Sequence, residues 1–389
     1  MRVLLISPLR DMDPPCGDIT YTETLVANPP DGVVYETYAD AIRRGTLIEH
    51  ARRGRFWKEP VLTACNKMIN LLRKTKHLFW EPFRFFSVLP GEYDLIHLHV
   101  FNARFLSIDC PLVLSSGAPQ KDLYLDRRQY SPTRVRLLAS IDRKLGKAFR
   151  VNCNSSYMPQ AQRVLVYTEY YRNYLITNRY VEPDRVSVIP ILSSTPDVII
   201  TRRTPRRIGF VARDFNEKGG PIVIDAFLSV RRVHPSAELW IVGSKPQISR
   251  DEAAPLGITW LEVVPREQVL NELMPSFDVF AYPTPHDCFS YVLLEAMSCG
   301  VAIATSDYVS MPEAVDYGKA GLTSPVGNAD KLAENILTLF NSDMNWKFRQ
   351  AARKRFEEYF SWEAIAPRIL DEYRKSISDY IAAQPVHDV

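Results

Sequence analysis

The feature that most constrains the fold of this sequence is a short helical segment between two apolar strands. Residues 279–282 (V-F-A-Y) predict a buried strand that leads into a proline-rich loop. A helical pattern follows the loop and ends at Gly300, and residues 301–304 (V-A-I-A) predict a second buried strand. In such a corner, backbone N–H groups and the positive end of the helix dipole point at whatever lies above the sheet edge. The corner is therefore a candidate ligand site.

Two carboxylates belong to this corner. Asp287 lies in the loop, and Glu295 lies roughly one turn into the helix. The helix neighbours of Glu295 are mostly apolar, so an ionised carboxylate there needs a partner or costs on the order of several kcal/mol. A helix cap together with a solvated glutamate explains the same spacing. The rest of the chain has to decide between these two interpretations.

The alternation of strands and helices extends through the whole chain. A length of 389 residues predicts two domains, because one hydrophobic core rarely serves so long a chain. Apolar strands at residues 3–6 and 207–213 each begin a series of alternating strands and helices. Residues 192–205, rich in Ser, Thr and Pro, are the best domain boundary. We therefore expect an α/β protein with two doubly wound parallel sheets, and a ligand at the carboxyl ends of their strands in the cleft between them.

The composition is typical of a soluble globular protein, with 46% apolar and 24% charged residues. No apolar run approaches the length of about 18 residues that a membrane-spanning helix needs. The short apolar run at the N-terminus predicts a first strand rather than a signal peptide. The six cysteines show neither C-x-x-C pairs nor metal-ligand spacing, which indicates free thiols in a reducing cytosol.

Residues 42–86 form an unusually basic and aromatic segment. They contain eleven lysines and arginines against three glutamates, in a chain whose net charge is only +3. Phenylalanine and tryptophan residues lie between these charges, a combination that suits helices on an anionic membrane surface. A helix hairpin packed on its own sheet explains the pattern equally well. A nucleic-acid surface is disfavoured, because no nucleic-acid motif accompanies the segment.

Two local patterns resemble those of a known family. Arg213 follows the strand 207–213, and Lys218-Gly219 comes five residues later, similar to the family pattern G-R-x-x-x-x-K-G. Residues 287–300 read D-C-F-S-Y-V-L-L-E-A-M-S-C-G, similar to E-x-F-G-x-x-x-x-E-A-M-A-x-G. In these patterns the chain resembles the retaining glycosyltransferases of the GT-B fold, in glycosyltransferase family 4.

Weaker similarities extend this resemblance along the chain. They lie at residues 94–99 (D-L-I-H-L-H), 163–169 (R-V-L-V-Y-T-E), 186–190 (V-S-V-I-P) and 360–363 (F-S-W-E). The resemblance implies a GT-B fold of two Rossmann-like domains. The implied organisation is an acceptor-binding domain at 1–195 with 42–86 as a helical insert, a donor-binding domain at 196–362, and a C-terminal helix at 363–389 that crosses back to the first domain.

The resemblance also implies roles for individual residues. Arg213 and Lys218 would grip the diphosphate of a nucleotide-sugar, Glu295 would accept hydrogen bonds from the ribose, and Asp287 from the transferred sugar. These four are the expected catalytic residues, and the nucleobase would lie near residues 264–266. The residues expected to bind the donor, largely through backbone groups, are Gly17, Gly117, Val264, Arg266, Phe289, Ser290, Tyr291 and Val292. No metal and no other cofactor are implied.

The sequence departs from the family pattern in three places. Asp287 stands where the family usually has a glutamate. Gly17 is single where many relatives have a glycine pair. Residues 115–118 read S-S-G-A and lack the histidine that relatives often carry after this strand. Asp122 or the backbone of Gly117 would have to replace that histidine as a contact to the sugar.

The function implied is that of a retaining hexosyltransferase. We expect it to move a sugar from a UDP- or GDP-type donor to a glycan, lipid or lipid-linked acceptor, in the cytoplasm or on the inner face of the membrane through residues 42–86. Two alternatives stay open: a GT-B enzyme acting on a soluble acceptor, and a non-catalytic, membrane-associated binding protein of the same fold. No nucleic-acid partner is expected.

Overall fold

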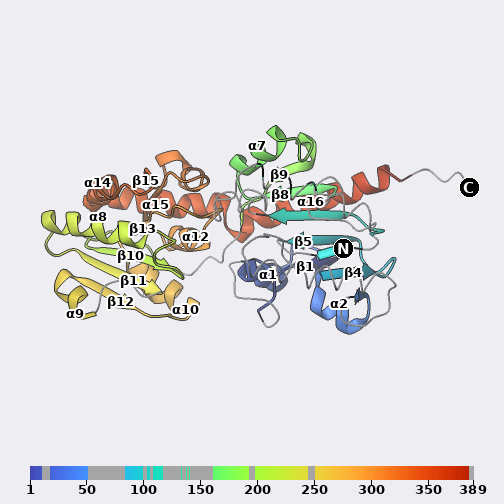
Figure 1. Ribbon diagram of the computed structural model, residues 1–389, viewed down its shortest axis with the longest axis horizontal. Helices are drawn as coiled ribbons and strands as arrows, with labels where there is room; N and C mark the ends of the chain where they lie inside the picture. The colour runs from blue at the N-terminus through green and yellow to red at the C-terminus, as the bar shows by residue number, and fades with distance from the viewer. Residues whose placement is uncertain are drawn as a thin grey trace, which may run out of the picture. The chain divides into compact units, whose positions relative to one another are not determined.

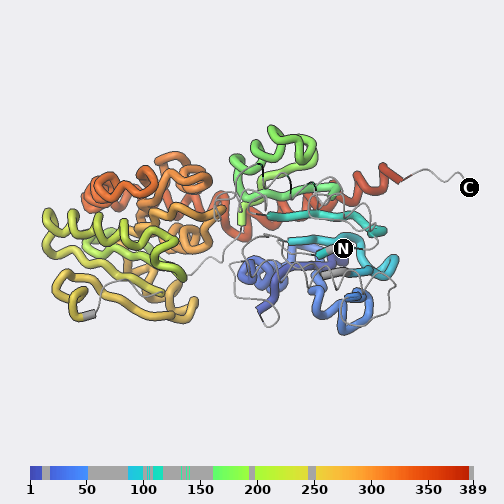
Figure 2. The backbone as a smooth tube through the Cα atoms, in the orientation of Figure 1, coloured from blue at the N-terminus to red at the C-terminus, as the bar shows by residue number. Residues whose placement is uncertain are grey.

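The computed structural model describes residues 1–10, 18–50, 84–99, 103–105, 108–116, 161–191, 198–243 and 250–384, with residues 133, 137 and 140 (Figure 2). The chain forms two compact units. Unit 1 comprises Met1–Ile189 and Ala366–Val389, and unit 2 comprises Pro190–Ile365. Each unit contains a six-stranded parallel sheet, which confirms the predicted pair of doubly wound α/β domains.

The main sheet of unit 1 has the strand order β2-β1-β5-β7-β8-β9 (Figure 1). All described pairings in it are parallel. Its central strands are largely apolar and largely buried, as expected for strands covered on both faces. The strands are β1 (Arg2–Ile6), β2 (Val34–Thr37), β5 (Leu95–His99), β7 (Leu112–Ser116), β8 (Arg163–Val166) and β9 (Val186–Val188).

The helices of unit 1 include the C-terminal part of the chain. Helix α16 (Trp362–Ala382) begins in unit 2, and from Ala366 onward it belongs to unit 1. Within unit 1, Arg368 of α16 donates to the carbonyl of Val188, and Arg163 pairs with Asp379 at 2.6 Å. The predicted return of the C-terminal helix to the first domain is thus confirmed. The other helices are α1 (Asp18–Ala27), α2 (Tyr38–Arg44), α7 (Glu169–Thr177) and the 3-10 turn η2 (Pro183–Arg185).

The basic segment 42–86 differs from its prediction near both ends. Strand β3 (Leu47–Glu49) pairs antiparallel with β4 (Arg84–Val88), and β4 pairs in parallel with β6 (Ala103–Phe105). Residues 42–44 thus end helix α2, whereas residues 47–49 and 84–86 are extended rather than helical, because they gain ladder partners that are distant in the sequence. Residues 51–83, which carry most of the basic and aromatic side chains, lie outside the described residues.

The sheet of unit 2 has the strand order β12-β11-β10-β13-β14-β15. The chain adds β11 and β12 on one side of β10 and then returns to place β13 on its other side. The strand order thus reverses between β10 and β13, where an open α/β sheet places its ligand. The strands are β10 (Arg207–Ala212), β11 (Glu238–Gly243), β12 (Ile258–Leu261), β13 (Val279–Tyr282), β14 (Ala302–Ser306) and β15 (Leu322–Ser324).

Helices cover both faces of this sheet. Helix α8 packs on α14, and α12 packs on α15 (Figure 1). Right-handed crossovers put α8 and α12 on opposite faces, because their connections run in opposite directions from the reversal point. The helices are α8 (Gly220–Val233), α9 (Arg250–Ala253), α10 (Arg266–Gln268), α11 (Met274–Ser276), α12 (Tyr291–Ser298), α13 (Met311–Ala314), α14 (Ala329–Phe340) and α15 (Ser342–Tyr359). The tighter or wider turns are η3 (Ala254–Leu256), η4 (Val269–Leu273) and η5 (Asp316–Gly318).

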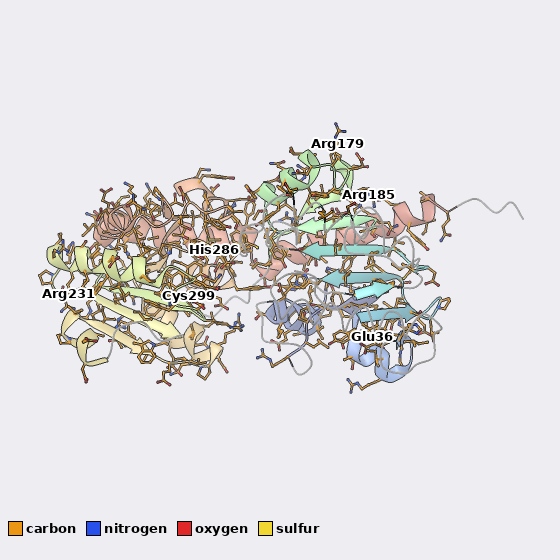
Figure 3. All side chains as sticks on the ribbon, viewed as in Figure 1. Glu36, Arg179, Arg185, Arg231, His286 and Cys299 are labelled. Atoms are coloured by element: carbon orange, nitrogen blue, oxygen red, sulfur yellow. The ribbon has the colours of Figure 1, made fainter. Side chains whose placement is uncertain are left out.

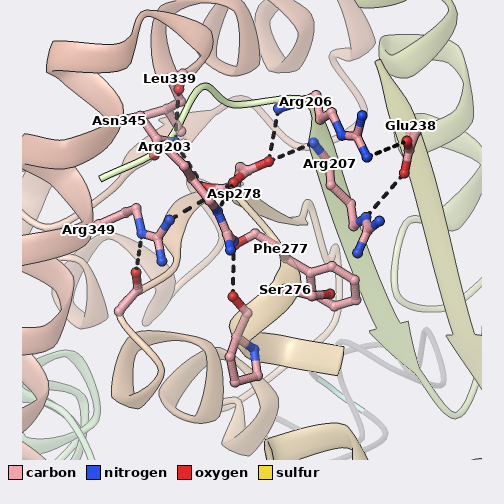
Figure 4. Close-up of polar contacts among 12 residues, drawn as sticks. Arg203, Arg206, Arg207, Glu238, Ser276, Phe277, Asp278, Leu339, Asn345 and Arg349 are labelled. Carbon is pink, nitrogen blue, oxygen red and sulfur yellow. Dashed lines mark hydrogen bonds and ion pairs between the residues drawn. The ribbon is translucent and has the colours of Figure 1, made fainter. Parts of the chain in front are cut away.

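A buried carboxylate anchors the amino end of the unit 2 sheet. Asp278, which precedes β13, accepts hydrogen bonds from the Arg203 guanidinium and from the backbone N–H groups of Arg206 and Arg207, the latter two at 2.8 Å (Figure 4). Its side chain is 4% exposed. Asn345 of α15 donates to the Asp278 carbonyl at 2.9 Å. These bonds fix the segment before β10 and helix α15 to the start of β13.

Among the described residues, none of the helices combines the length and apolar character needed to cross a membrane.

Candidate active site

Two loops meet at the carboxyl edge of the unit 2 sheet, where the strand order reverses. One follows β10 and carries Arg213 and Lys218, and the other follows β13 and carries Asp287. Because β10 and β13 are hydrogen-bonded neighbours in parallel register, their carboxyl ends lie side by side. The fold therefore brings together residues that are about 70 positions apart in the sequence.

A glycine sets the distance between the two loops. Gly219, immediately after Lys218, has a φ of +85° and caps the N-terminus of α8. A β-carbon at this position would lie 2.5 Å from the carbonyl oxygen of Pro283. The backbone of the first loop thus packs directly on the second, in a conformation that glycine adopts at no steric cost.

Lys218 and Asp287 form an ion pair across these loops. The Lys218 ammonium donates to Asp287 Oδ2 at 2.9 Å and to the carbonyl of His286 at 2.7 Å. The hydroxyl of Tyr282, the last residue of β13, also donates to Asp287 Oδ2, at 3.0 Å. Both charged side chains stay partly accessible, Lys218 at 20% and Asp287 at 14% exposure. The sequence did not indicate the roles of Tyr282 and the His286 carbonyl.

Arg213 lies next to this pair along the chain but behaves differently. It follows β10 directly and is exposed. Within the part of the chain that the structure describes, its guanidinium makes no hydrogen bond or ion pair. An exposed guanidinium without a protein partner can accommodate an anionic ligand without first losing a contact.

Glu295, the second predicted carboxylate, pairs with another predicted residue. Its side chain on α12 is 9% exposed, and Oε1 accepts a hydrogen bond from Arg266 Nε at 2.7 Å. Burial raises the pKa of Glu295 above its usual value, and the charge and hydrogen bond of Arg266 partly oppose this rise. Glu295 is therefore neither a cap nor a solvated glutamate, but a buried carboxylate with one cationic partner.

The start of α12 faces the same edge of the sheet. Ser290 is the N-cap, and its hydroxyl accepts a hydrogen bond from the Leu293 N–H at 3.4 Å. Phe289 is buried, with its ring 5.8 Å from that of Phe360, so its side chain contributes packing rather than ligand contacts. Figure 3 labels His286 in the loop before this helix and Cys299 at its end. The other predicted donor contacts here, Tyr291 and Val292, are half-buried in the first turn.

The comparisons with known proteins agree with this geometry. Residues 205–342 match the family described as glycosyl transferases group 1. The matched residues lie within unit 2, so it is this unit that is similar to the group 1 glycosyltransferases. Alpha-maltose-1-phosphate synthase of Mycolicibacterium smegmatis is 29% identical over 187 residues, which are 43% of this chain and 47% of the synthase. D-inositol 3-phosphate glycosyltransferase of Mycobacteroides abscessus is 25% identical over 76% of this chain and 69% of that enzyme.

Solved structures identify the fold of the chain. Sucrose-phosphate synthase from Thermosynechococcus elongatus aligns with a TM-score of 0.63 at 16% identity, over 97% of this chain and 99% of that chain. The Anabaena HepE protein, solved with UDP and glucose, aligns with a TM-score of 0.61 over 95% and 98% of the two chains, also at 16% identity. The predicted GT-B fold is thereby confirmed.

The carboxyl edge of the unit 1 sheet has a different character. His97 and His99 on β5 are fully buried and share the hydroxyl of Ser115, at 2.7 and 2.6 Å. The other ring nitrogen of His97 contacts the hydroxyl of Tyr373 on α16 at 2.6 Å, and Tyr373 contacts Tyr35 at 2.9 Å. Burial, with a smaller effect of His99, holds the pKa of His97 well below its usual value, so its ring is neutral at physiological pH.

Some of the predicted site lies beyond what the structure describes. Gly17 and Gly117, predicted to approach the donor from the first domain, and Asp122, the candidate substitute for the missing histidine, lie outside the described residues. Val264 is half-buried just before α10, next to Arg266. The structure thus brings Lys218, Asp287 and the start of α12 together, and places Arg266 against Glu295.

Proposed function

We propose that this protein is a retaining glycosyltransferase that transfers a hexose from a UDP- or GDP-type nucleotide-sugar. The observation that carries the proposal is the partly exposed Lys218–Asp287 ion pair at the reversal point of the unit 2 sheet, on a loop that also carries Arg213, whose side chain has no partner among the described residues. The sugar nucleotides in related proteins support the donor class, since HepE was solved with UDP-glucose. A diphosphate is the ligand that two adjacent cations and a helix N-terminus suit best.

In this proposal the donor exchanges the contacts of Lys218. Phosphate oxygens would draw the Lys218 ammonium away from Asp287, and Arg213 would bind the same diphosphate. Asp287, released from Lys218, would then accept hydrogen bonds from hydroxyls of the sugar, and Glu295 from those of the ribose. As the bond between the anomeric carbon and the phosphate oxygen breaks, the two cations stabilise the charge that develops on the leaving diphosphate.

The proposed reaction requires no protein base and no metal. The acceptor oxygen bonds to the anomeric carbon on the face that the diphosphate leaves, and the acceptor proton passes to a leaving phosphate oxygen. This stereochemical outcome, retention, is the one that the family resemblance implies. Arg213 and Lys218 supply the positive charge that a metal ion supplies elsewhere.

The donor is tested by thermal-shift screening against a panel of nucleotide-sugars, since a bound donor raises the unfolding temperature by mass action. Release of nucleoside diphosphate from the selected donor then measures turnover. Lys218→Ala is expected to lower kcat/KM by about 10²- to 10³-fold, because it removes a cation from the leaving group. The matched control Lys331→Ala removes an exposed lysine of α14 and should leave kcat/KM unchanged. Equal activity in all three proteins would refute the proposed roles.

The acceptor is proposed to be a lipid or a lipid-linked glycan. The basic and aromatic composition of residues 42–86 supports this class, and so does a relative named phosphatidyl-myo-inositol mannosyltransferase, 27% identical over 187 residues. Liposome flotation with anionic lipid tests the proposal. The parent protein should float, and replacement of Arg52, Arg53 and Arg55 by glutamate should abolish flotation. Flotation of the variant equal to that of the parent would disprove membrane contact through this segment.

A further inference from the structure

The contact between Arg266 and Glu295 is part of a wider alignment between two segments of unit 2. Arg266 Nε donates to Glu295, and Cys299 Sγ of α12 contacts the carbonyl of Leu270 at 3.5 Å. Residues four apart on one segment therefore contact residues four apart on the other, so the two segments are matched turn by turn. The position of Arg266 against α12 is thus fixed by the fold and not by its side chain alone.

A wide helical turn lies within this alignment. Residues 266–276 form one continuous helical segment, but its middle part, η4, is a π-helix. A π-helical turn carries an extra residue relative to an α-helix and is frequent at functional sites. Val269 and Leu270 of this turn are buried. The π turn begins between the two contacts of this segment, that of Arg266 with Glu295 and that of the Leu270 carbonyl with Cys299.

One of the two carboxylate oxygens of Glu295 is hydrogen-bonded within the described part of the protein. Oε1 accepts from Arg266, whereas Oε2 receives no hydrogen bond from any residue that the structure describes. Two arginines on the neighbouring helix α15 are occupied elsewhere: Arg349 donates to the carbonyl of Gly300 and Arg353 to that of Ser298. Cys299 also interacts with Glu295, but burial raises the pKa of Cys299 to about 12, so it is a neutral thiol. Arg266 is therefore the cation that balances Glu295.

We propose that Arg266 is a positioning residue for donor binding, which holds the Glu295 carboxylate ionised and leaves its second oxygen to accept a ribose hydroxyl. This inference rests on the proposed function and extends it to a residue whose side chain was not expected to act. Without Arg266, burial alone would govern the carboxyl group, which would take up a proton closer to neutral pH. A protonated carboxyl is a poorer acceptor for hydroxyl groups, so donor affinity would become pH-dependent.

The experiment measures the affinity of a nucleoside diphosphate as a function of pH by calorimetry. UDP, GDP and ADP are compared on the parent protein, and the tightest binder serves as the probe. Arg266→Met is expected to bind the probe about tenfold more weakly near pH 6 and to approach the parent above about pH 8, where the carboxyl ionises again. Arg266→Lys keeps the positive charge, and its affinity for the probe near pH 6 should lie between those of the parent and of Arg266→Met. Glu295→Gln should bind weakly at every pH.

Two controls separate the possible results. Arg232→Ala removes an exposed arginine at the end of α8 and should match the parent across the pH range. In the ligand-free protein, carbon-13 NMR of Glu295 should show its titration shifted upward in Arg266→Met. A loss in Arg266→Met that is equal at every pH, or no loss, would overturn the inference while leaving the proposed function intact. A parent protein that binds none of the three nucleotides would overturn both.

Discussion

Two aspartates flank strand β13, and they differ in how completely the protein satisfies them. Asp278, before the strand, has a side chain that is 4% exposed and accepts hydrogen bonds from one guanidinium and two backbone N–H groups. The guanidinium of Arg349 lies 3.9 Å from the same carboxylate. Asp287, after the strand, is 14% exposed, and its contacts come from Lys218 and Tyr282. The protein itself supplies the hydrogen-bond donors of Asp278, so this carboxylate stabilises the fold. The second keeps accessible acceptor capacity, which is what a binding site needs.

The cations around the two aspartates differ in the same way. Arg203 also donates to the carbonyls of Pro275 and Phe277, at 2.9 and 2.8 Å, so it is committed to the fold. Burial, together with the nearby Arg203, lowers the pKa of Arg349 to about 10, and the residue still carries its charge at neutral pH. Lys218, in contrast, is partly exposed, and in the proposed function it exchanges Asp287 for a phosphate of the donor. The same residue types thus stabilise one end of the sheet and form a candidate site at the other.

The largest effect is expected at the structural end of this comparison. Asp278→Ala leaves Arg203 and two backbone N–H groups without their acceptor in a buried place, which should cost about 3–5 kcal/mol of unfolding free energy. Chemical denaturation measures the loss, and Asp278→Asn, which keeps one acceptor oxygen, should lose less. A stability within about 1 kcal/mol of the parent would show that this network is not needed for folding.

The second prediction concerns the aspartate at the other end of the strand. Asp287→Asn should lower kcat/KM by about 10- to 100-fold, because an amide cannot accept sugar hydroxyls as strongly as a carboxylate. Its unfolding free energy should stay within about 1 kcal/mol of the parent, since Lys218 keeps the His286 carbonyl. Steady-state kinetics and denaturation on the same sample check both parts. A large loss of stability with unchanged kcat/KM would reverse the comparison.

The smallest effect concerns buried His97 of unit 1, which is hydrogen-bonded to Ser115 and Tyr373. His97 is neutral when folded, but in the unfolded chain it gains a proton below a pH of about 6.5. Because the unfolded state then binds more protons, stability should fall as the pH drops, by about 1 kcal/mol between pH 7.5 and 5.5. Denaturation at both pH values, in the parent and in His97→Gln, isolates this contribution. An equal decrease in both proteins would assign it to other groups.

The sequence predicted those parts of the molecule that depend on local pattern. The alternation of strands and helices gave two parallel sheets, and the spacing of Lys218 and Asp287 relative to their strands placed both at one sheet edge. The sequence did not predict which side chains distant along the chain form pairs. Arg266 and Glu295 are 29 residues apart, and Arg266 directly precedes the segment that contains a π turn, which the sequence pattern did not predict.

Non-local pairing also explains the differences elsewhere. Residues 84–88, at the end of the basic segment, form strand β4, because β3 and β6 supply partners from residues 47–49 and 103–105. Asp278 lies just before a strand, where a carboxylate is usually solvated. The donors to its carboxylate come from the preceding linker, and Arg349 of α15 is an ion-pair partner at 3.9 Å. Such roles follow from tertiary packing, which propensity does not encode.

The close approach at Gly219 has a consequence for how the two loops can move. The backbone of the loop after β10 lies directly against the carbonyl of Pro283 in the loop after β13. We therefore expect the two loops to move together, as one cradle that is already formed before the ligand binds. A ligand that enters such a cradle loses little affinity to the ordering of flexible chain, so more of its contact energy remains as binding. Any side chain at position 219 would push the two loops apart, so that each ligand would have to bring them together again when it binds.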